Sequence, residues 1–442
     1  MEKIKLRDYQ NEIANNTWKA LLDGKKRILI QSPCRSGKTE VMLSIIQYIL
    51  NKSHGDVWVL SHKVLIKAEI NTRIKKYDMA NQNLFNETIF SIGKIPSEKP
   101  FAIFIDEAHH SRAKSYEDVL KKYPNAYVFG FTATPERADG KGFSKLFEEI
   151  VVGPSVSDLI KWGYLVDYKA FKYKAKSKTD DVMGDAAKWY LEHGNGEQAL
   201  YYAHRNISDL PMIKKHFEDS GISAEFLVGG NKEKQEETLN NFKKKKFKVL
   251  ISIDTLGEGI DVPECSIVIM GRRTTSSTIY VQQTMRCMGK NKDNPNKTAK
   301  IVDLVGNFDI HGTIEQDRNW VLLDDKQTLT TQGKGKRRKL TRNKVTFNFR
   351  TQIEEIDPAD YNITKDTELM TYQEIIARFK AMNYLPGWVY HQMKTKAWQD
   401  RNPDALPYSV IVKVLYEDYN RRNGTNLKPG TQNNRRRTVF NY

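Results

Sequence analysis

The first part of the chain alternates short, continuous apolar runs with stretches of helical periodicity. Each apolar run is strand-sized and ends in a polar turn, and the residues between the runs place apolar side chains on one face, as at 41–50. The runs lie at 28–31, 57–60, 101–105 and 127–131. Continuous apolar strands that alternate with helices predict a parallel sheet that is buried on both faces. We therefore expect a doubly wound α/β domain over residues 1–165.

A second series of the same kind follows a polar stretch at 174–184. Its five strand candidates lie at 199–203, 224–228, 249–253, 266–270 and 300–304. The pattern predicts a linker over 166–184 and a second doubly wound domain over 185–323. Ligands of such sheets bind at the carboxyl ends of the strands, so the turns after these runs are the candidate site.

The character of the chain changes after residue 323. Residues 331–344 contain seven basic residues and no acidic one, which indicates a basic linker region over 324–370. Thr371 and Glu374 have the spacing of a capping box, and a helical pattern over 409–423 stops at Gly424. We expect residues 371–442 to form a mostly helical, basic C-terminal domain.

Composition places the chain among globular proteins. Hydrophobic residues make up 39% and charged residues 28%, and the start of the chain lacks the apolar stretch of a signal peptide. A cytoplasmic protein that does not enter a membrane is expected. Cys34, Cys265 and Cys287 are far apart, which argues against a disulfide framework and against a structural zinc site.

The balance of charge points to a polyanionic partner. The chain has 71 basic and 54 acidic residues, a formal net charge of +17. Lysine and arginine that neutralise phosphates release condensed counterions, so a surplus of this size favours nucleic-acid binding.

Residues 32–39, Ser-Pro-Cys-Arg-Ser-Gly-Lys-Thr, lie between a predicted strand and a predicted helix. Backbone N–H groups around Ser36 and Gly37 are expected to cradle phosphates at the positive end of that helix. Lys38 would reach the β- and γ-phosphates of ATP, and the Thr39 hydroxyl would bind Mg²⁺.

Asp106 and Glu107 directly follow the apolar run 101–105. An isolated acidic pair after a strand is usually a solvated turn, but the upstream phosphate loop favours a catalytic interpretation. We assign Asp106 to the metal and Glu107 to the attacking water. His109 and His110 are adjacent and point in different directions, which argues against a metal site built on them.

Together these segments resemble the motifs of superfamily 2 helicases, and within them the RadD-like and phage-encoded DEAD/DEAH-type DNA helicases. The resemblance covers roughly residues 6–323, with a fainter similarity at 384–388. It implies two tandem RecA-like doubly wound domains, ATP and Mg²⁺ as cofactors, and DNA as the partner.

The resemblance also implies nucleotide contacts outside the phosphate loop. Segment 6–10 is similar to the segment that recognises adenine. In it, Arg7 would contribute to nucleotide binding and Gln10 would contact the base. Segment 257–261 is similar to motif V, in which Gly259 and Asp261 contact ATP. Segment 282–286 is similar to motif VI, which supplies Gln282 and, as the arginine finger, Arg286.

Further residues are assigned by the same resemblance to coupling and to the nucleic acid. Motifs II and III would couple hydrolysis to strand movement through three residues: His109, Thr132 and Thr134. Motif Ia and the loops after motif III and around motif V would touch the nucleic acid through six residues: Ser61, His62, Lys63, Arg137, Thr255 and Gly257.

Two positions depart from the family pattern. Ser32 replaces the first glycine of the phosphate loop, and Gly289 stands where a second motif VI arginine is usual. Lys290 follows directly, but lysine lacks the planar fork of arginine. These departures bear on the efficiency of hydrolysis.

The leading hypothesis is an ATP-dependent DNA helicase that translocates on DNA and unwinds or remodels it, with single-stranded or branched DNA as the substrate. Its expected process is phage replication, recombination or repair, and its possible protein partners are those of replication or recombination. Three alternatives stay open: a double-stranded DNA translocase without strand separation, an RNA helicase, and a nucleic-acid-binding scaffold that does not hydrolyse ATP. The presence of Lys38, Asp106 and Arg286 counts against the scaffold.

Overall fold

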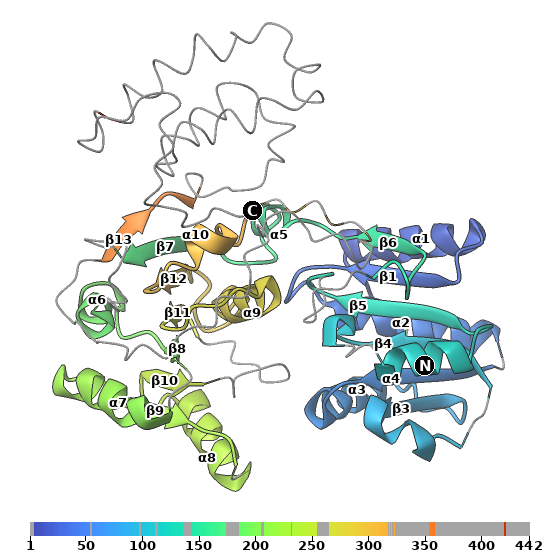
Figure 1. Ribbon diagram of the computed structural model, residues 1–442, viewed down its shortest axis with the longest axis horizontal. Helices are drawn as coiled ribbons and strands as arrows, with labels where there is room; N and C mark the ends of the chain where they lie inside the picture. Colours follow the sequence, from blue (N-terminus) through green and yellow to red (C-terminus); the bar gives the residue numbers. More distant parts are fainter. Residues whose placement is uncertain are drawn as a thin grey trace, which may run out of the picture. The chain divides into compact units, whose positions relative to one another are not determined.

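The computed structural model divides the chain into two compact units (Figure 1). The first contains Met1–Glu315, Asn319–Leu329 and Asn343–Pro358, and the second contains Gln316–Arg318, Thr330–Arg342 and Ala359–Tyr442. The structure describes residues 4–53, 55–96, 99–110, 114–135, 143–173, 185–204, 207–230, 232–253, 265–316, 318, 320, 322, 353–358 and 420. The predicted helical module at 371–442 lies outside the described residues, apart from Asn420.

The first lobe of the first unit is a six-stranded parallel sheet with the order β3-β2-β4-β5-β1-β6. Its strands are β1 (Arg27–Gln31), β2 (Asp56–Ser61), β3 (Leu84–Thr88), β4 (Pro100–Ile105), β5 (Tyr127–Thr132) and β6 (Glu149–Val152). The four predicted strands of this half are confirmed, because they correspond to β1, β2, β4 and β5. These four strands are almost entirely buried, which explains their continuous apolar sequences.

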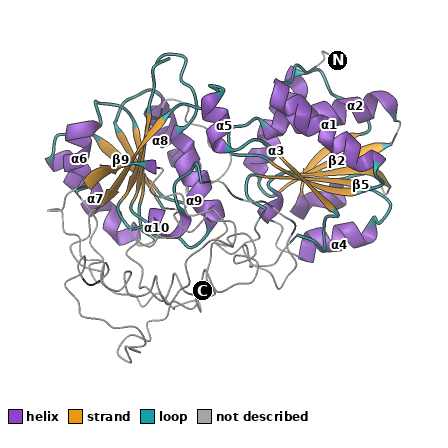
Figure 2. Ribbon diagram, turned by 90° about the horizontal axis from the view of Figure 1, so that it is seen from above, coloured by secondary structure: helices purple, strands orange, loops and turns teal. Residues whose placement is uncertain are grey.

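Helices cover both faces of this sheet. They are α1 (Asp8–Leu22), α2 (Lys38–Lys52), α3 (Val64–Lys76) and α4 (Lys114–Lys122). Figure 2 shows α1 and α2 over one face and α4 over the other. Tyr116 and Leu120 of α4 pack into a core cluster with Trp58 of β2, which fixes that face.

The second lobe of the first unit is a seven-stranded sheet with the order β13-β7-β12-β11-β8-β10-β9. Its strands are β7 (Tyr168–Tyr173), β8 (Ala199–Tyr202), β9 (Ala224–Leu227), β10 (Val249–Ser252), β11 (Ile267–Met270), β12 (Ala299–Asp303) and β13 (Ile353–Ile356). All pairings are parallel except that of β13 with β7. The five strands predicted for this half are confirmed as β8 to β12.

Six further helices accompany this part of the chain. They are α5 (Val156–Lys161), α6 (Ala186–His193), α7 (Leu210–Asp219), α8 (Lys232–Lys243), α9 (Ser277–Thr284) and α10 (Phe308–His311). Trp189 of α6 and Phe217 of α7 belong to one core cluster with Tyr201 of β8 and Ile251 of β10. The predicted architecture of two doubly wound parallel sheets is therefore correct.

Two segments that the sequence places in linkers form strands of the second sheet. β7 falls within the predicted linker 166–184, and β13 falls within the predicted basic region 324–370. β13 is the edge strand: it pairs antiparallel with β7 alone and is exposed to half-buried, and edge strands need less apolar sequence. β7 lies between β13 and β12 and is mostly buried, but its two lysines interrupt the apolar run, so the sequence did not indicate it.

Among the described residues, no helix is both long and apolar enough to cross a membrane.

Gly130 of β5 tests the packing of the first sheet. A Cβ atom at this position would lie 2.7 Å from Cε1 of Phe147, whose ring fills the space beside the strand. We expect Gly130→Ala to lower the free energy of unfolding by about 1–3 kcal/mol through overpacking, measured by chemical denaturation. Gly93→Ala is the matched control, because nothing lies within 4 Å of its added Cβ. Equal stability of the two variants would contradict this account of the core.

Candidate active site

The phosphate loop joins β1 to α2 in the first lobe. Gly37 is the N-cap of α2 and has φ +81°, a left-handed conformation that glycine adopts without steric cost. Lys38 and Thr39 therefore stand in the first turn of the helix, where free N–H groups attract anions. Lys38 Nζ lies 3.4 Å from the Pro33 carbonyl, a long hydrogen bond that a phosphate could replace.

Ser32, at the usual first glycine position, is accommodated by its surroundings. Its hydroxyl donates to Ser36 Oγ at 2.7 Å, and Ser36 Oγ donates to the Pro33 carbonyl at 2.7 Å. Gly153, after β6, leaves the room that the Ser32 hydroxyl needs, since a Cβ there would lie 2.9 Å from Ser32 Oγ. Serine in place of glycine at position 32 thus adds hydrogen bonds within the loop and does not distort it.

Segment 6–10 holds the phosphate loop from the side of α1. Tyr9 Oη and Gln10 Nε2 both donate to the Ser36 carbonyl, at 2.7 and 2.9 Å. Gln10 Oε1 accepts from the Arg7 backbone N–H at 2.9 Å. Both ends of the Gln10 amide are thus engaged within the protein, and the side chain is 3% exposed. The expected contact of Gln10 with adenine would require one of these bonds to be exchanged.

An aromatic group that the motifs did not reveal lies against this segment. Tyr9 stacks on Trp162 with ring centroids 6.0 Å apart and meets Tyr164 edge-on at 5.0 Å. The Arg7 guanidinium lies 4.6 Å from the centre of the Tyr164 ring, a cation–π contact. Burial raises the pKa of Tyr9, so its hydroxyl stays a donor to the loop. In the sequence, the only sign of this group is the Trp-x-Tyr pair at 162–164, which follows a short amphipathic turn.

The acidic turn follows β4 at its carboxyl end. Asp106 is 7% exposed, and its Oδ1 accepts from the Glu107 backbone N–H at 3.0 Å. Glu107 has φ +49°, a strained conformation for a non-glycine residue that costs on the order of 1–3 kcal/mol. Glu107 Oε2 is buried and lies 3.4 Å from His109 Nδ1, too poorly placed to count as a hydrogen bond among the described residues. A buried carboxylate oxygen with only this long contact can still accept a hydrogen bond from a water molecule.

The carboxylate of Asp106 and the hydroxyl of Thr39 are hard oxygen donors of the kind that Mg²⁺ prefers. The described residues contain no cluster of three or more His, Cys, Asp or Glu side chains that could hold a metal. Two protein oxygens fit a magnesium ion that is bound mainly through nucleotide phosphates and water.

His109 links the acidic turn to the end of β5. His109 Nδ1 lies 2.9 Å from Thr132 Oγ1, which itself donates to the Thr134 carbonyl at 2.8 Å. Because the Thr132 hydroxyl proton is used in that bond, His109 carries its proton on Nδ1 and presents Nε2 as an acceptor. His109 is 3% exposed and both threonines are fully buried, so the network is shielded from water. The three predicted coupling residues thus form one connected chain.

The second lobe completes this chain through α9. Gln282 Nε2 donates to His109 Nε2 at 3.1 Å, in agreement with the tautomer deduced above. Thr134 Oγ1 and Thr278 Oγ1 form a second hydrogen bond at 2.8 Å. Thr278 carries no motif that would have identified it from the sequence. Arg286 follows in a short 3-10 helix, Met285–Cys287, so the predicted motif VI residues share one continuous segment.

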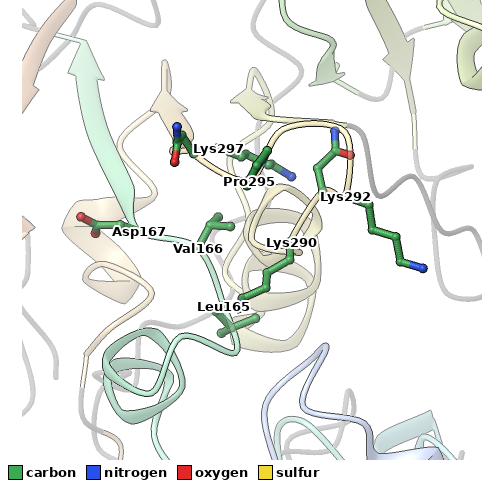
Figure 3. A pocket seen from close by; sticks show the side chains of 9 residues that line it. Leu165, Val166, Asp167, Lys290, Lys292, Pro295 and Lys297 are labelled. Atoms are coloured by element: carbon green, nitrogen blue, oxygen red, sulfur yellow. The ribbon is translucent and has the colours of Figure 1, made fainter.

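A lysine-lined pocket of about 500 Å³ lies next to that segment (Figure 3). Its lining includes Lys290, Lys292 and Lys297 from the loop before β12, and Leu165, Val166 and Asp167 from the segment just before β7. Lys297 is 4% exposed and donates to the Gly289 carbonyl at 2.8 Å. Burial lowers the pKa of Lys297. This lysine fixes the backbone directly after motif VI.

The predicted nucleic-acid contacts of motif Ia lie at the end of β2. Ser61 is fully buried and donates to the Lys63 carbonyl at 3.3 Å, so it shapes the turn and does not face a ligand directly. The His62 ring lies 5.6 Å from the ring of Phe90, which is 73% exposed. Val64 is also exposed. An exposed aromatic ring beside a histidine and Lys63 is a candidate stacking surface that no sequence motif indicates.

Five predicted site residues lie outside the described residues, and their roles stay predictions. They are Arg137, Thr255, Gly257, Gly259 and Asp261.

Two family profiles match the chain. The profile of the helicase conserved C-terminal domain matches residues 183–289, and that of the type III restriction enzyme res subunit matches 3–97 and 81–137. The 51.5 kDa protein of Lactococcus phage (isolate 7-9) is 30% identical over 317 residues, which span 66% of this chain and 68% of the relative. The two profile matches fall on the two lobes of the structure: the res-subunit profile on the first lobe and the C-terminal helicase profile on the second.

More distant relatives share the same region. The mitochondrial protein irc3 of Schizosaccharomyces pombe, whose name describes an ATP-dependent helicase, is 27% identical over 59% of this chain, which spans 51% of its length. The DNA 3'-5' translocase XPB2 of Sulfurisphaera tokodaii is 24% identical over 69% of this chain and 82% of its own. A solved fragment described as an HsdR subunit of a type I restriction enzyme from Vibrio vulnificus has a TM-score of 0.56 at 18% identity, over 68% of this chain and 64% of that one. The structural likeness supports the fold.

The hydrogen bond from Tyr9 to the phosphate loop predicts a measurable effect on nucleotide binding. Tyr9→Phe keeps the stacked ring and removes the hydroxyl, which donates to the Ser36 carbonyl and accepts from Arg7 Nη1 at 2.9 Å. We expect the affinity for a fluorescent ATP analogue to fall about fivefold, which corresponds to the loss of about 1 kcal/mol. Tyr164→Phe, which keeps the ring under Arg7, is the matched control. An unchanged affinity in Tyr9→Phe would show that this bond does not hold the loop for the nucleotide.

Proposed function

Because this chain belongs to the superfamily 2 helicases and translocases, the ATP-hydrolysing motors that act on nucleic acids, we propose that it is a DNA-dependent motor that unwinds or remodels DNA strands. The observation that carries this proposal is the buried hydrogen-bonded chain from Thr132 through His109 to Gln282. Such a chain joins the turn that holds the attacking water to the segment that holds the arginine finger. It gives hydrolysis a route by which to move one lobe against the other.

In this mechanism the first lobe binds and orients the nucleotide. Lys38 and the N-terminus of α2 hold the β- and γ-phosphates, and Thr39 and Asp106 would hold Mg²⁺. When bound there, the ion would supply positive charge to the phosphate oxygens. Glu107, whose buried Oε2 has only a long contact of 3.4 Å with His109 Nδ1, orients and deprotonates the attacking water.

The second lobe supplies the missing positive charge. Charge spreads over the γ-phosphate oxygens in the transition state, and a cation placed there accelerates transfer. Arg286 would provide it when α9 and the acidic turn are bonded through Gln282 and His109. Loss of the γ-phosphate would then weaken the bonded state, and the lobes would separate. If each lobe holds the strand, one such cycle is one step.

Three features support DNA as the track. The net charge of +17 favours a polyanion, and the exposed Phe90 ring beside His62 offers a face on which a base can stack. The relative XPB2 is named a DNA translocase, which favours movement on duplex DNA without strand separation as the second candidate. The phage relative supports a role in phage replication, recombination or repair.

ATP hydrolysis by the purified protein tests this function. Turnover is measured without nucleic acid and with single-stranded DNA, branched DNA, blunt duplex DNA and RNA. We expect stimulation by DNA, and a loss of about 10²–10⁴-fold in kcat for Glu107→Gln with ATP binding retained, because only the water-activating group is removed. Lys38→Ala is the second control, with binding itself weakened.

The best activator separates the candidates. Preference for single-stranded or branched DNA together with strand displacement favours the helicase, and preference for duplex DNA without displacement favours the translocase. Tight DNA binding without any hydrolysis would contradict both and leave the scaffold. Stimulation by RNA alone would assign the motor to RNA.

The exposed ring of Phe90 predicts a separate effect on DNA affinity. Stacking of one base on an aromatic side chain contributes about 1–3 kcal/mol, so Phe90→Ala should weaken binding to single-stranded DNA at least about fivefold. Fluorescence anisotropy of a labelled oligonucleotide measures this. Leu191→Ala on α6 removes a comparably exposed apolar side chain and serves as control. Equal affinities of the two variants would exclude Phe90 from the DNA-binding surface.

A further inference from the structure

Arg35 occupies an unusual backbone position in the phosphate loop. It has φ +64°, in the left-handed region that is unfavourable for any residue with a Cβ atom. Glycine would adopt the same conformation without strain. A strained arginine in a loop that binds phosphates indicates that its side chain performs a task that offsets the strain.

The side chain of Arg35 reaches the segment after motif VI. Its Nη2 donates to the Arg286 carbonyl at 2.9 Å. A Cβ atom built on Gly289 would lie 2.8 Å from Cζ of Arg35 and closer still to Nη1. The guanidinium therefore stands in the space where any side chain at position 289 would begin.

The backbone at Gly289 has little freedom to move away. Its carbonyl accepts a hydrogen bond from the buried ammonium of Lys297 at 2.8 Å, and the Val166 N–H donates to the neighbouring Met288 carbonyl at 3.1 Å. The close approach of Arg35 to Gly289 is thus held from both sides. The φ of Gly289 is not in the left-handed region, so the constraint at 289 is this contact: a larger residue there would have to displace the Arg35 guanidinium.

We propose that Arg35 and Gly289 are a reciprocal pair, in which the phosphate-loop arginine replaces the second arginine that motif VI lacks. Arg35 delivers a guanidinium to the same place from the opposite lobe, orients Arg286 through its carbonyl, and adds a second positive charge beside the γ-phosphate. Lys290 does not have this task, because it is exposed and lines the neighbouring pocket. This inference rests on the proposed function, since it assigns a role in ATP hydrolysis.

The pair is tested by exchanging its members. Arg35→Gly removes the guanidinium and also the backbone strain, so it should fold at least as well as the natural protein. We expect its DNA-stimulated kcat to fall about 100-fold with little change in KM, as for the loss of one charge-stabilising donor. Gly289→Arg should also impair turnover, because its side chain meets Arg35. The double variant Arg35→Gly/Gly289→Arg should recover to within about tenfold of the natural protein.

Two controls separate this role from a structural one. Gly229→Arg adds the same side chain at an exposed glycine with nothing within 4 Å of its Cβ, and should leave turnover unchanged. Added guanidinium ion should partly restore turnover to Arg35→Gly, whereas urea should not, since urea has the same shape without the charge.

The outcomes decide the pairing independently of the motor function. Full hydrolysis by Arg35→Gly, or a double variant no more active than Gly289→Arg alone, would overturn the pairing while the motor function stands. Absence of hydrolysis in the natural protein, at the level of Lys38→Ala, would overturn both. Recovery in the double variant together with guanidinium rescue supports the exchange.

Discussion

The hydrogen bond between His109 and Gln282 is the contact on which the proposed mechanism depends. It is buried on the His109 side and joins the acidic turn after β4 to α9 of the second sheet. The Thr132 hydroxyl donates to the Thr134 carbonyl and accepts from His109 Nδ1, which leaves His109 Nε2 as the acceptor of the bond from Gln282. In the proposed mechanism, a change at the γ-phosphate alters the bonding along this chain up to Gln282. The parallel sheets serve this arrangement, since the polar turns at their carboxyl ends are held by strands that cannot shift without exposing apolar surface.

Both departures from the family pattern are matched by a second residue elsewhere in the fold. Ser32 fits because Gly153 leaves room for its hydroxyl, and Arg35 fits because Gly289 has no side chain. Neither partner is near in sequence, and each small residue faces a larger one in the phosphate loop. The loop is thereby braced by Ser32 and linked to the motif VI segment by Arg35.

The sequence predicted the parts of the structure that depend on local order. Buried strands carry continuous apolar runs, so nine strands were located from periodicity, and the phosphate loop and acidic turn were found from their place after strands. The edge strand β13 was missed because an edge imposes no such run, and β7 was missed because two lysines interrupt its apolar residues. Gln10 was expected on a base but has both ends of its amide bonded to protein, which only the folded position of Ser36 determines. Trp162, Thr278 and Phe90 carry no motif, and their importance comes entirely from residues far away in the chain.

A double-mutant cycle on His109 and Gln282 tests the central claim most directly. The kcat for ATP hydrolysis at saturating DNA is measured for the natural protein, His109→Ala, Gln282→Ala and the double variant. If hydrolysis depends on their hydrogen bond, the double variant is little worse than the worse single one, with a coupling energy of about 1 kcal/mol or more, roughly a fivefold departure from independent effects. Effects on kcat that simply multiply would show that the two residues act independently and would contradict the account.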